Sequence, residues 1–467
     1  MKIISKTLRL LPLFLFVFAF QACSDDDDNG TPAPTQSNML EVIQNDPELA
    51  TLLAALDATG LSGAVETSPD ITVLAPTNAA FATFLNGADL ADLDLDEVAA
   101  ILLNHVLVGD FQAADLTSLG SGYASSSSPN EQGLNISVYF NTTNGVRFNN
   151  AGAVVENGAD INASNGTLHK IDGVLTLPSL LNHVENNSDF NTLNVALTAT
   201  GLSGAVGDEG ELWTILAPDN DAFTEFDPDL NDIPGVTQVL LNHVLNGSIT
   251  STMLENMGSG YSMTLASGPN DLADNATNLN LYFEAGDTVV FNGISTVSAA
   301  DVVGTNGVIH GVDTVVDLPT IATFATSNNA LSGLVNAVLR ADEGENVINW
   351  LPAISDPELL FTVFAPADPA FDVLLADLGL PLDQVPPAAV NDLLTLHVVN
   401  DANARSTDLG SLNGVIPTIG GNLTLDGLVI TDGNGNEINI LAPSLVDIQA
   451  VNGVVHAVDY VIRAAVE

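Results

Sequence analysis

The chain has 467 residues, 46% of them hydrophobic and 14% charged, which is enough for about three domains with a core each and too apolar for a chain that is disordered throughout. Its 58 acidic and 8 basic residues give a formal net charge of −50. Eight basic residues are too few to neutralise a nucleic-acid backbone, and they cannot form a polybasic segment that would bind anionic lipid. We therefore expect no nucleic-acid partner, and we leave divalent cations open as partners because they would screen repulsion between carboxylates.

The first residues have the pattern of a secretion signal. Three basic residues precede an apolar run over 10–20, which is too short to span a membrane as a helix. The only cysteine, Cys23, follows this run and resembles the modified cysteine of the bacterial lipobox. Phe20 and Gln21 depart from the usual lipobox, in the manner of the looser Bacteroidetes-type motifs. The resemblance implies a lipoprotein signal peptide over 1–22 and lipidation of Cys23, with ordinary cleavage and a free thiol as the alternative.

An acidic tether is predicted over residues 23–38. Four consecutive aspartates at 25–28 cannot be buried together, and the residues after them are rich in Gly, Thr, Pro and Ser, so we expect no folded structure here. An acidic run behind a lipidated cysteine resembles the surface-export signal of Bacteroidetes lipoproteins, although a plain spacer is the alternative. The implied location is the outer membrane, with the chain lipid-anchored and exposed at the cell surface.

Three copies of one unit fill the rest of the chain. The string ATGLSGAV at 58–65 returns at 199–206, and LLNHVL at 102–107 returns at 240–245. A more diverged third copy keeps an apolar run that ends in Ala-Pro. The period is longer than that of solenoid repeats, so each unit should fold around its own core. The predicted domains are 39–178, 180–319 and 321–465.

Within the first unit, helical signals precede strand signals. The predicted helices cover 46–60, 78–85 and 96–107, around a short strand at 72–75. The predicted strands cover 134–140, 145–149, 153–155 and 166–175, with Asn-Gly and Gly turns between them. This order predicts an α+β domain.

The recurring motifs resemble the two conserved segments of the fasciclin domain. The first is TVLAPTNAAF at 72–81, and the second is the Asn-Gly-x-x-His-x-x-Asp closing at 165–172, 306–313 and 452–459. The resemblance implies that each unit is a compact β-sandwich or wedge with helices packed along one side. The residues that match the family motifs are Pro76, Phe81, His105, His169, Pro218, Phe223, His243, His310, Pro366, Phe371, His397 and His456.

One family feature is changed in all three units. The family has a central Tyr-His pair, and the sequence has Asn104, Asn242 and Leu396 in place of the tyrosine. The integrin binding attributed to that region in animal members is therefore not transferred to this chain.

The histidines are the strongest candidates for chemistry, since six of the seven form one pair per unit. Zinc needs three or four ligands, and no third His or Cys recurs with the pairs, so we predict no metal site. We expect His105, His243 and His397 to be buried, with a ring N–H bonded to a backbone carbonyl. An aspartate follows each second histidine by three residues, and on a strand this spacing points the two side chains to opposite faces. We expect these aspartates to serve a turn or a cap; they are Asp172, Asp313 and Asp459.

No enzyme signature is present in the sequence. It contains no Gly-x-Ser-x-Gly elbow, no His-Glu-x-x-His and no phosphate loop, so we expect no catalytic residues, no cofactor and no enzyme activity. The segment 432–436 imitates the start of a calcium loop. That loop needs Gly at its sixth and Glu at its twelfth position, where this sequence has Glu437 and Pro443. A hairpin turn is the favoured interpretation.

The third unit carries an insertion. Its Ala-Pro lies 148 residues after that of the second unit, compared with 142 residues between the first two. The extra residues fall within 341–357 and predict a surface loop. Trp350 on this loop would be an exposed aromatic side chain able to stack on a sugar; its alternative is to fold back onto its own domain.

The chain has three similar domains after a predicted membrane anchor. When each domain binds a partner weakly, several domains on one anchored chain bind it more strongly together. We expect a lipid-anchored adhesion protein that binds other cells or matrix polysaccharide, with an extracellular polysaccharide or a cell-surface protein as partner. The adhesive role is implied by the fasciclin resemblance alone. The alternatives are an accessory glycan-capturing subunit of an outer-membrane uptake system and a structural envelope spacer.

Overall fold

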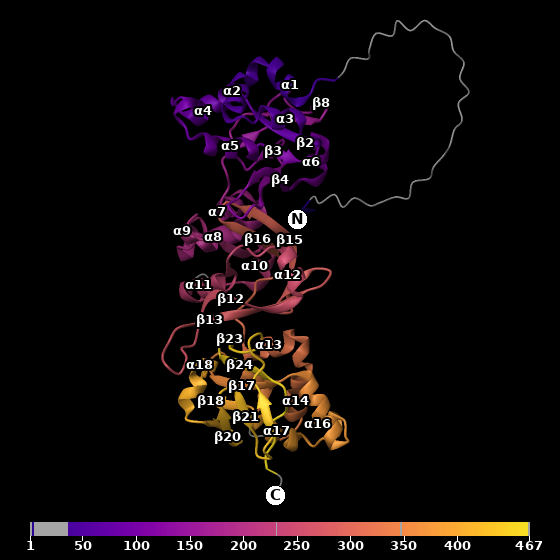
Figure 1. Ribbon diagram of the computed structural model, residues 1–467, viewed down its shortest axis with the longest axis vertical. Coiled ribbons are helices and arrows are strands. Elements are labelled where there is room, and N and C mark those ends of the chain that lie inside the picture. The colour runs from indigo at the N-terminus through magenta and orange to yellow at the C-terminus, as the bar shows by residue number, and fades with distance from the viewer. Residues whose placement is uncertain (1, 4–35, 230, 346–347, 466–467) are drawn as a thin grey trace, which may run out of the picture. The chain divides into compact units, whose positions relative to one another are not determined.

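A computed structural model describes residues 2–3, 36–229, 231–345 and 348–465 (Figure 1). The predicted signal peptide and tether lie almost entirely outside these residues, and so does Cys23. The chain divides into two compact units. One unit holds residues 1–186 and 302–305, and the other holds 187–301 and 306–467.

The first repeat begins with helices whose ends are set by local sequence. Asn38 and Glu41 form a capping box at the start of α1, and Gly60 ends α2 in the left-handed conformation. Thr77 caps α4 after the first strand of the repeat. Figure 1 shows α2, α4 and α5 lying together on one side of β2 and β3. The helices are α1 (Met39–Asn45), α2 (Ala50–Thr59), α3 (Ser62–Thr67), α4 (Asn78–Leu85), α5 (Leu95–Asn104) and α6 (Ala113–Leu119).

The strands of the first repeat form one sheet in the order β7-β6-β5-β4-β3-β2-β9-β8, with β1 paired to β4. The pair β2 and β9, next to the edge strand β8, is parallel, with Val73 opposite Leu168. The other neighbours along this order are antiparallel. The strands are β1 (Lys2–Ile3), β2 (Ile71–Pro76), β3 (Val106–Val108), β4 (Ser121–Pro129), β5 (Asn135–Asn141), β6 (Arg147–Phe148), β7 (Gly152–Ala153), β8 (Ile161–Ala163) and β9 (Gly166–Ile171).

Strand β2 separates two apolar clusters and is buried along its whole length. Val73 and Ala75 belong to the cluster that includes the helices, whereas Leu74 between them belongs to the cluster formed with the long strands. Alternate side chains of a strand point to opposite faces. A strand covered on both faces therefore reads as an unbroken apolar run, as the TVLAP motif does.

In the second repeat the strands β10 to β16 form a closed barrel. Strand β10 pairs in parallel with β16, in the register seen for β2 and β9. The helices are α7 (Leu180–Asn186), α8 (Asn191–Thr200), α9 (Ser203–Val206), α10 (Asn220–Phe226), α11 (Ile233–Asn242) and α12 (Ser251–Met257). The strands are β10 (Trp213–Pro218), β11 (Val244–Asn246), β12 (Ser259–Gly268), β13 (Thr277–Ala285), β14 (Val289–Phe291), β15 (Ser295–Gly304) and β16 (Gly307–Val312).

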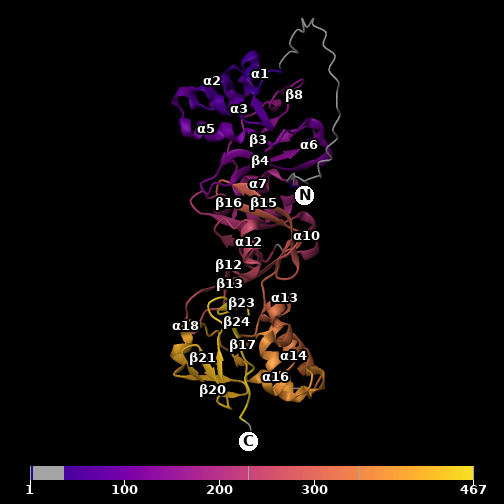
Figure 2. The same cartoon turned by 45° about the vertical axis from the view of Figure 1, so that its right-hand side comes forward.

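The third repeat has two four-stranded sheets, β18-β17-β24-β23 and β19-β20-β21-β22. Figure 2 shows α14 and α16 on one side of β17 and the strands β20 and β21 on the other. The helices are α13 (Ile321–Ser327), α14 (Ser332–Asp342), α15 (Trp350–Ser355), α16 (Asp368–Leu378), α17 (Pro387–Thr395) and α18 (Ser406–Leu409). The strands are β17 (Phe361–Pro366), β18 (Val398–Asn400), β19 (Val415–Thr418), β20 (Gly421–Asp426), β21 (Val429–Thr431), β22 (Glu437–Asn439), β23 (Ile448–Ala450) and β24 (Gly453–Val458).

The α+β class is confirmed, and the predicted helix at 78–85 coincides with α4. The helix predicted to run to Leu107 ends at Asn104, because His105 caps it and the next residues form β3. Helix α1 was not predicted, although the capping box at Asn38 signals it. Strand β4 was not predicted either, because its serine-rich sequence lacks the residues that favour strands.

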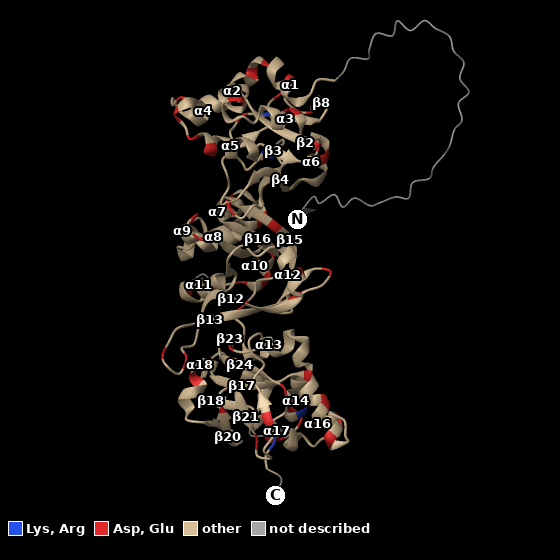
Figure 3. Ribbon diagram, in the orientation of Figure 1, with Lys and Arg blue, Asp and Glu red and all other residues tan. Residues whose placement is uncertain are grey.

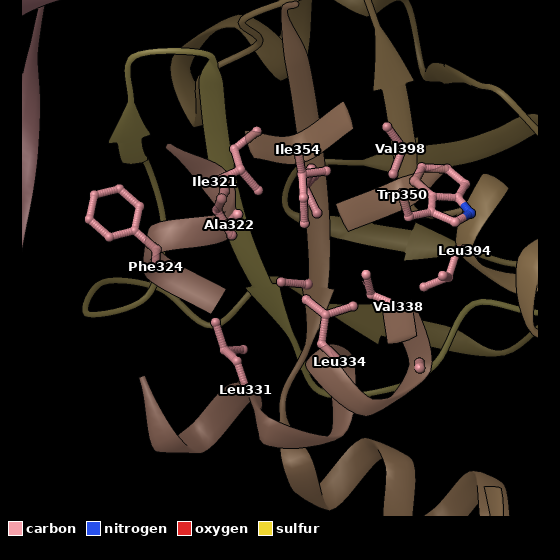
Figure 4. Packing of buried hydrophobic residues seen from close by; sticks show 14 of the residues in the cluster. Ile321, Ala322, Phe324, Leu331, Leu334, Val338, Trp350, Ile354, Leu394 and Val398 are labelled. Carbon is pink, nitrogen blue, oxygen red and sulfur yellow. The ribbon is translucent and has the colours of Figure 1, made fainter. Parts of the chain in front are cut away.

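The insertion of the third repeat contains the helix α15, where a surface loop was predicted (Figure 4). Trp350 is only 2% exposed and packs in the core of the third repeat, and its Nε1 donates to Asn391 Oδ1 at 3.0 Å. The carboxylate of Asp342 accepts from the backbone N–H of Trp350 at 2.7 Å and so holds the start of α15. Trp350 and Ile354 are one helical turn apart and face the same core. Of the two alternatives for Trp350, folding back onto its own domain is confirmed, and the exposed, sugar-stacking side chain is wrong.

Candidate functional site

The first histidine of each pair connects the end of a helix to the segment that follows the closing strand. His105 is 2% exposed and lies directly after α5. The backbone N–H of Leu175 donates to its Nε2 at 2.9 Å, so the proton is on Nδ1, which donates to the carbonyl of Ile101 at 2.7 Å. The same two bonds are made by His243 with Val316 and Val239, and by His397 with Ile462 and Leu393.

Burial sets the charge of these rings. Removal from water lowers the pKa of His105, His243 and His397 from 6.5 to about 4, and the bond to the helix carbonyl opposes this shift only in part. The rings are therefore neutral at pH 7, and both nitrogens of each ring already have a backbone partner. Neither nitrogen is free to bind a metal or to act as a base.

The second histidine of each pair has the opposite tautomer. In the first repeat the N–H of Asp160 donates to Nδ1 of His169 at 3.2 Å, and Nε2 donates to the carbonyl of Phe111 at 2.9 Å. Asp172, three residues after His169, accepts instead from the N–H of Ala153 at 2.7 Å. His310 and His456 make the corresponding bonds, and burial lowers the pKa of both.

The carboxylate beside the second histidine was not found from the sequence. Asp160, Asp301 and Asp447 each lie nine residues before that histidine with a positive φ near 56° or 57°, and the separation matches no local pattern. Each carboxylate accepts a hydrogen bond from the backbone N–H of the first residue of a short helix, as Asp160 does from Ala113 at 2.7 Å. These aspartates therefore tie α6, α12 and α18 to the sheet.

In the third repeat this aspartate lies between a serine and a histidine, which invites comparison with a hydrolase triad. Ser406 Oγ donates to Asp447 Oδ2 at 2.6 Å, and Asp447 Oδ1 lies 3.8 Å from Nδ1 of His456. A triad requires the serine hydroxyl beside a free histidine nitrogen. Here the serine faces the carboxylate, and Nε2 of His456 donates to the carbonyl of Ala404 at 2.8 Å. The group is a helix cap and has no general base.

The Asn-Gly of the closing motif links three segments in each repeat. Asn165 Oδ1 accepts from the N–H of Met39 at 2.9 Å, and its Nδ2 donates to the carbonyl of Val65 at 3.0 Å. Gly166 has a φ of +148°, and a Cβ there would lie 1.9 Å from the carbonyl oxygen of Ile71. Asn452–Gly453 has the corresponding bonds and close contact. In the second repeat Asn306 Nδ2 donates to the carbonyl of Val206 at 2.8 Å, and a Cβ on Gly307 would lie 1.9 Å from the carbonyl oxygen of Trp213.

The other residues of the family motifs are also buried. Pro76, Pro218 and Pro366 end β2, β10 and β17, at the last register position of the parallel pair. Phe81, Phe223 and Phe371 are 3%, 4% and 6% exposed. Like the paired histidines, they build the interior of the repeat.

The Asp432 segment forms a hairpin turn between β21 and β22. Asp432 Oδ1 accepts from the N–H groups of Asn434 and Asn436, both at 2.9 Å, and Oδ2 accepts from the N–H of Arg463 at 3.3 Å. This carboxylate is occupied by the backbone of its own loop and of the last segment described. Among the residues that the structure describes, no three His, Cys, Asp or Glu side chains are grouped to hold a metal ion.

Acidic residues outnumber basic residues along the ribbon (Figure 3). Within residues 36–465 four of the five basic side chains pair with carboxylates, as Lys170 does with Asp46 at 3.1 Å. With 58 acidic and 8 basic residues in the sequence, most of the negative charge has no basic residue to balance it. The large apolar side chains that are exposed in the described part of the chain are aliphatic or methionine, such as Val195 and Leu339.

The first and third repeats each have an open cleft at corresponding places. In the third repeat it lies between α14 and α16, has a volume of about 820 Å³, and is lined by Leu339, Leu375 and the carboxylates Asp372 and Asp383. In the first repeat a cleft of about 630 Å³ lies between α2 and the segment after α4, and Ala54 and Ala58 of α2 line it.

No helix in the described ranges is both long and apolar enough to cross a membrane.

Comparison with known proteins supplies the relationship. A model of the Fasciclin domain family matches residues 47–178, 188–319 and 331–464. Transforming growth factor-beta-induced protein ig-h3 of Sus scrofa is 28% identical over 64% of this chain and 42% of its own length. Protein sll1735 of Synechocystis sp. is 30% identical over 30% of this chain and 98% of its own length. A solved FAS1 domain pair from the insect cell adhesion molecule Fasciclin I aligns with a TM-score of 0.40 and 20% identity, over 59% of this chain and 97% of that one. This chain thus spans less than half the length of its ig-h3 relative.

Proposed function

Because the chain belongs to the fasciclin domain family, we propose that it is a cell-surface adhesion protein, held in the outer membrane by a lipid on Cys23, that binds other cells or extracellular polysaccharide through its three domains. The proposal rests chiefly on one observation. The polar residues shared by the three repeats are used inside the fold, so contacts with a partner must be made by the outer surface.

The outer surface suits weak binding at several places. The clefts of the first and third repeats lie at corresponding positions on the helical side, and both combine aliphatic and acidic lining residues. Each cleft is open and shallow enough that we expect weak affinity from one repeat. Modules on one chain raise avidity without any new contact, and an anchored chain would present them together.

The glycan-capturing alternative has lost its candidate residue. Sugar stacking needs an exposed aromatic face, and Trp350 is in the core of its repeat. We therefore favour adhesion to a protein surface or to a polysaccharide bound through its hydroxyl groups, with carboxylates such as Asp372 as acceptors.

The binding proposal is tested by filling the clefts. Ala58 and Asn336 are exposed and line the clefts of the first and third repeats, so the pair Ala58→Trp and Asn336→Trp should block both. We expect aggregation of cells displaying the protein, and retention of residues 24–467 on a glycan or cell-surface array, to fall at least about tenfold. The matched control is Ala114→Trp on α6, which is exposed and outside both clefts. Equal binding by the filled variant and the control would exclude the clefts as the adhesive surface.

The anchoring proposal is tested separately. Cys23→Ala should release the protein from the membrane fraction, whereas Cys23→Ala protein that stays membrane-bound after a carbonate wash would contradict lipidation. Repeating the array with and without calcium shows whether divalent cations take part in binding.

A further inference from the structure

The outer face of the hairpin β12–β13 in the second repeat carries two tyrosines. Tyr261 and Tyr282 are cross-strand partners, and their ring centroids are 5.1 Å apart. Their strand neighbours Leu281 and Phe283 point the other way, into the apolar cluster of the second repeat. The tyrosine pair therefore points outward from that cluster and needs a cover of its own.

The third repeat supplies that cover. Phe324 of α13 lies edge-on to Tyr261, with centroids 5.4 Å apart and an interplanar angle of 85°. Tyr282 is 3% exposed and belongs to the core cluster of the third repeat. An apolar cluster that takes residues from two repeats makes them one packed body.

Hydrogen bonds surround this aromatic centre. Beside α13, Asn328 Nδ2 donates to Tyr261 Oη at 3.0 Å, and Ser327 Oγ donates to the carbonyl of Asn292 at 2.7 Å. Beside β23, the N–H of Gln449 donates to Asn280 Oδ1 at 2.7 Å. Asn403 Nδ2 donates to the carbonyl of Pro269 at 2.9 Å. An apolar centre with a satisfied polar rim is the anatomy of a stable interface.

The first unit has a seam of the same design. Tyr123 and Tyr139 pair across β4 and β5 with centroids 5.3 Å apart, and His183 of α7 lies edge-on to Tyr123 at 5.4 Å. The N–H of Val303 donates to Ser137 Oγ at 3.0 Å. Helix α7 and residues 302–305 belong to the second repeat in sequence, and His183 has the place in α7 that Phe324 has in α13.

We propose that the paired-tyrosine face of the hairpin is a docking surface for the first helix of the following fasciclin repeat, and that through it the second and third repeats fold and unfold as one cooperative unit. This inference is independent of the adhesive function. It fixes the spacing and orientation of two of the three modules that a partner would meet.

The full chain offers a direct test, because its two tryptophans are Trp213 in β10 and Trp350 in α15, one in each of these repeats. We would follow urea unfolding in Trp350→Phe, which leaves the reporter of the second repeat, and in Trp213→Phe, which leaves that of the third. Pulsed hydrogen exchange with mass spectrometry follows the same unfolding at β10 and β17 in the protein that keeps both tryptophans. It checks that neither Trp substitution is itself the cause of coincident transitions.

The proposal predicts that β10 and β17 lose protection at the same urea concentration. It also predicts that Trp350→Phe, a change in the core of the third repeat, lowers the midpoint reported by Trp213. Removing the seam with Tyr261→Ala and Asn328→Ala should separate the two transitions by about 1 M urea. Tyr261→Phe keeps the ring and should leave them coincident.

Tyr123→Ala is the matched control, since it removes the equivalent tyrosine from the first repeat and should leave the transitions of the second and third repeats coincident. Separate unfolding transitions of the second and third repeats in the protein with an unmodified seam would overturn the proposal. Transitions that stay coincident after Tyr261→Ala and Asn328→Ala would overturn it as well, because the coupling would then not pass through this face.

Discussion

The helix before the central strand is anchored alike in the first and third repeats and is packed differently. Asn165 donates to the carbonyl of Val65 at the end of α3, and Asn452 donates to that of Ile354 near the end of α15. Helix α3 buries only Val65, whereas α15 buries Trp350 and Ile354. The repeats therefore share a set of buried hydrogen bonds, which we call the frame. They differ in the apolar side chains packed against it, which we call the filling. Changes to the frame should cost the same in every repeat, and changes to the filling should not.

The largest effect is expected at the glycine of the frame. Gly453→Ala would place a Cβ 1.8 Å from the carbonyl oxygen of Phe361, against the backbone of β17. We expect a loss of more than about 4 kcal/mol of unfolding free energy and unfolding of the cooperative unit that contains the third repeat, measured by hydrogen exchange across β17 and β24. Gly421→Ala is the control, because Gly421 has a similar φ of +140° with open space around it. It should cost only about 1–3 kcal/mol of backbone strain, and equal losses would refute the role of the close approach.

The filling should show the contrast between the repeats. Trp350→Ala empties a core site and should destabilise the cooperative unit that contains the third repeat by about 3–5 kcal/mol. The corresponding Leu61, which lies four residues before Val65, is only partly buried, so Leu61→Ala should cost the first repeat less than half as much. Urea unfolding followed by hydrogen exchange in each repeat gives both values, and similar costs would mean that α3 and α15 are packed alike.

The histidine of the frame should cost the same in both repeats. His105→Ala and His397→Ala each leave a cavity and two unpaired backbone groups, for a loss of roughly 2–4 kcal/mol in the cooperative unit that carries the change. The measurement is the unfolding free energy of that unit, by urea and by hydrogen exchange in the first and third repeats. Costs that differ by more than about 1 kcal/mol would show that the two rings are not equivalent.

Acid should act on the same frame. The pKa of His105 is about 4 in the fold and about 6.5 when unfolded, so the unfolded chain binds more protons between these values. The neutral ring contributes about 3 kcal/mol above pH 6.5, and this is lost as the pH falls from 6.5 towards 4. His105→Gln should flatten that part of the stability curve for the first repeat alone. An unchanged slope in this variant would show that carboxylates cause the acid sensitivity instead.

The sequence predicted the frame better than the filling. Motifs such as Asn452-Gly453 and His105 are local strings whose spacing repeats, so both could be located and His105 could be predicted to be buried. Asp447 was missed because it reaches His456 only when the chain turns back from β23 into β24. The nine-residue separation recurs in all three units and was the signal that could have found it. The place of Trp350 stayed open between two alternatives because an insertion usually forms a surface loop. The i, i+4 spacing of Trp350 and Ile354 favoured a packed helix and was the better guide.

The most direct test of the account is the tautomeric state of the paired histidines. Nitrogen NMR of the histidine-labelled protein at pH 7 should show neutral rings of two kinds. The proton should be on Nδ1 in His105, His243 and His397 and on Nε2 in His169, His310 and His456. Their signals should not move when one equivalent of zinc is added per domain. Charged rings at pH 7, or a stoichiometric zinc shift that is lost with His105→Ala, would contradict the conclusion that these residues build the fold and leave binding to the surface.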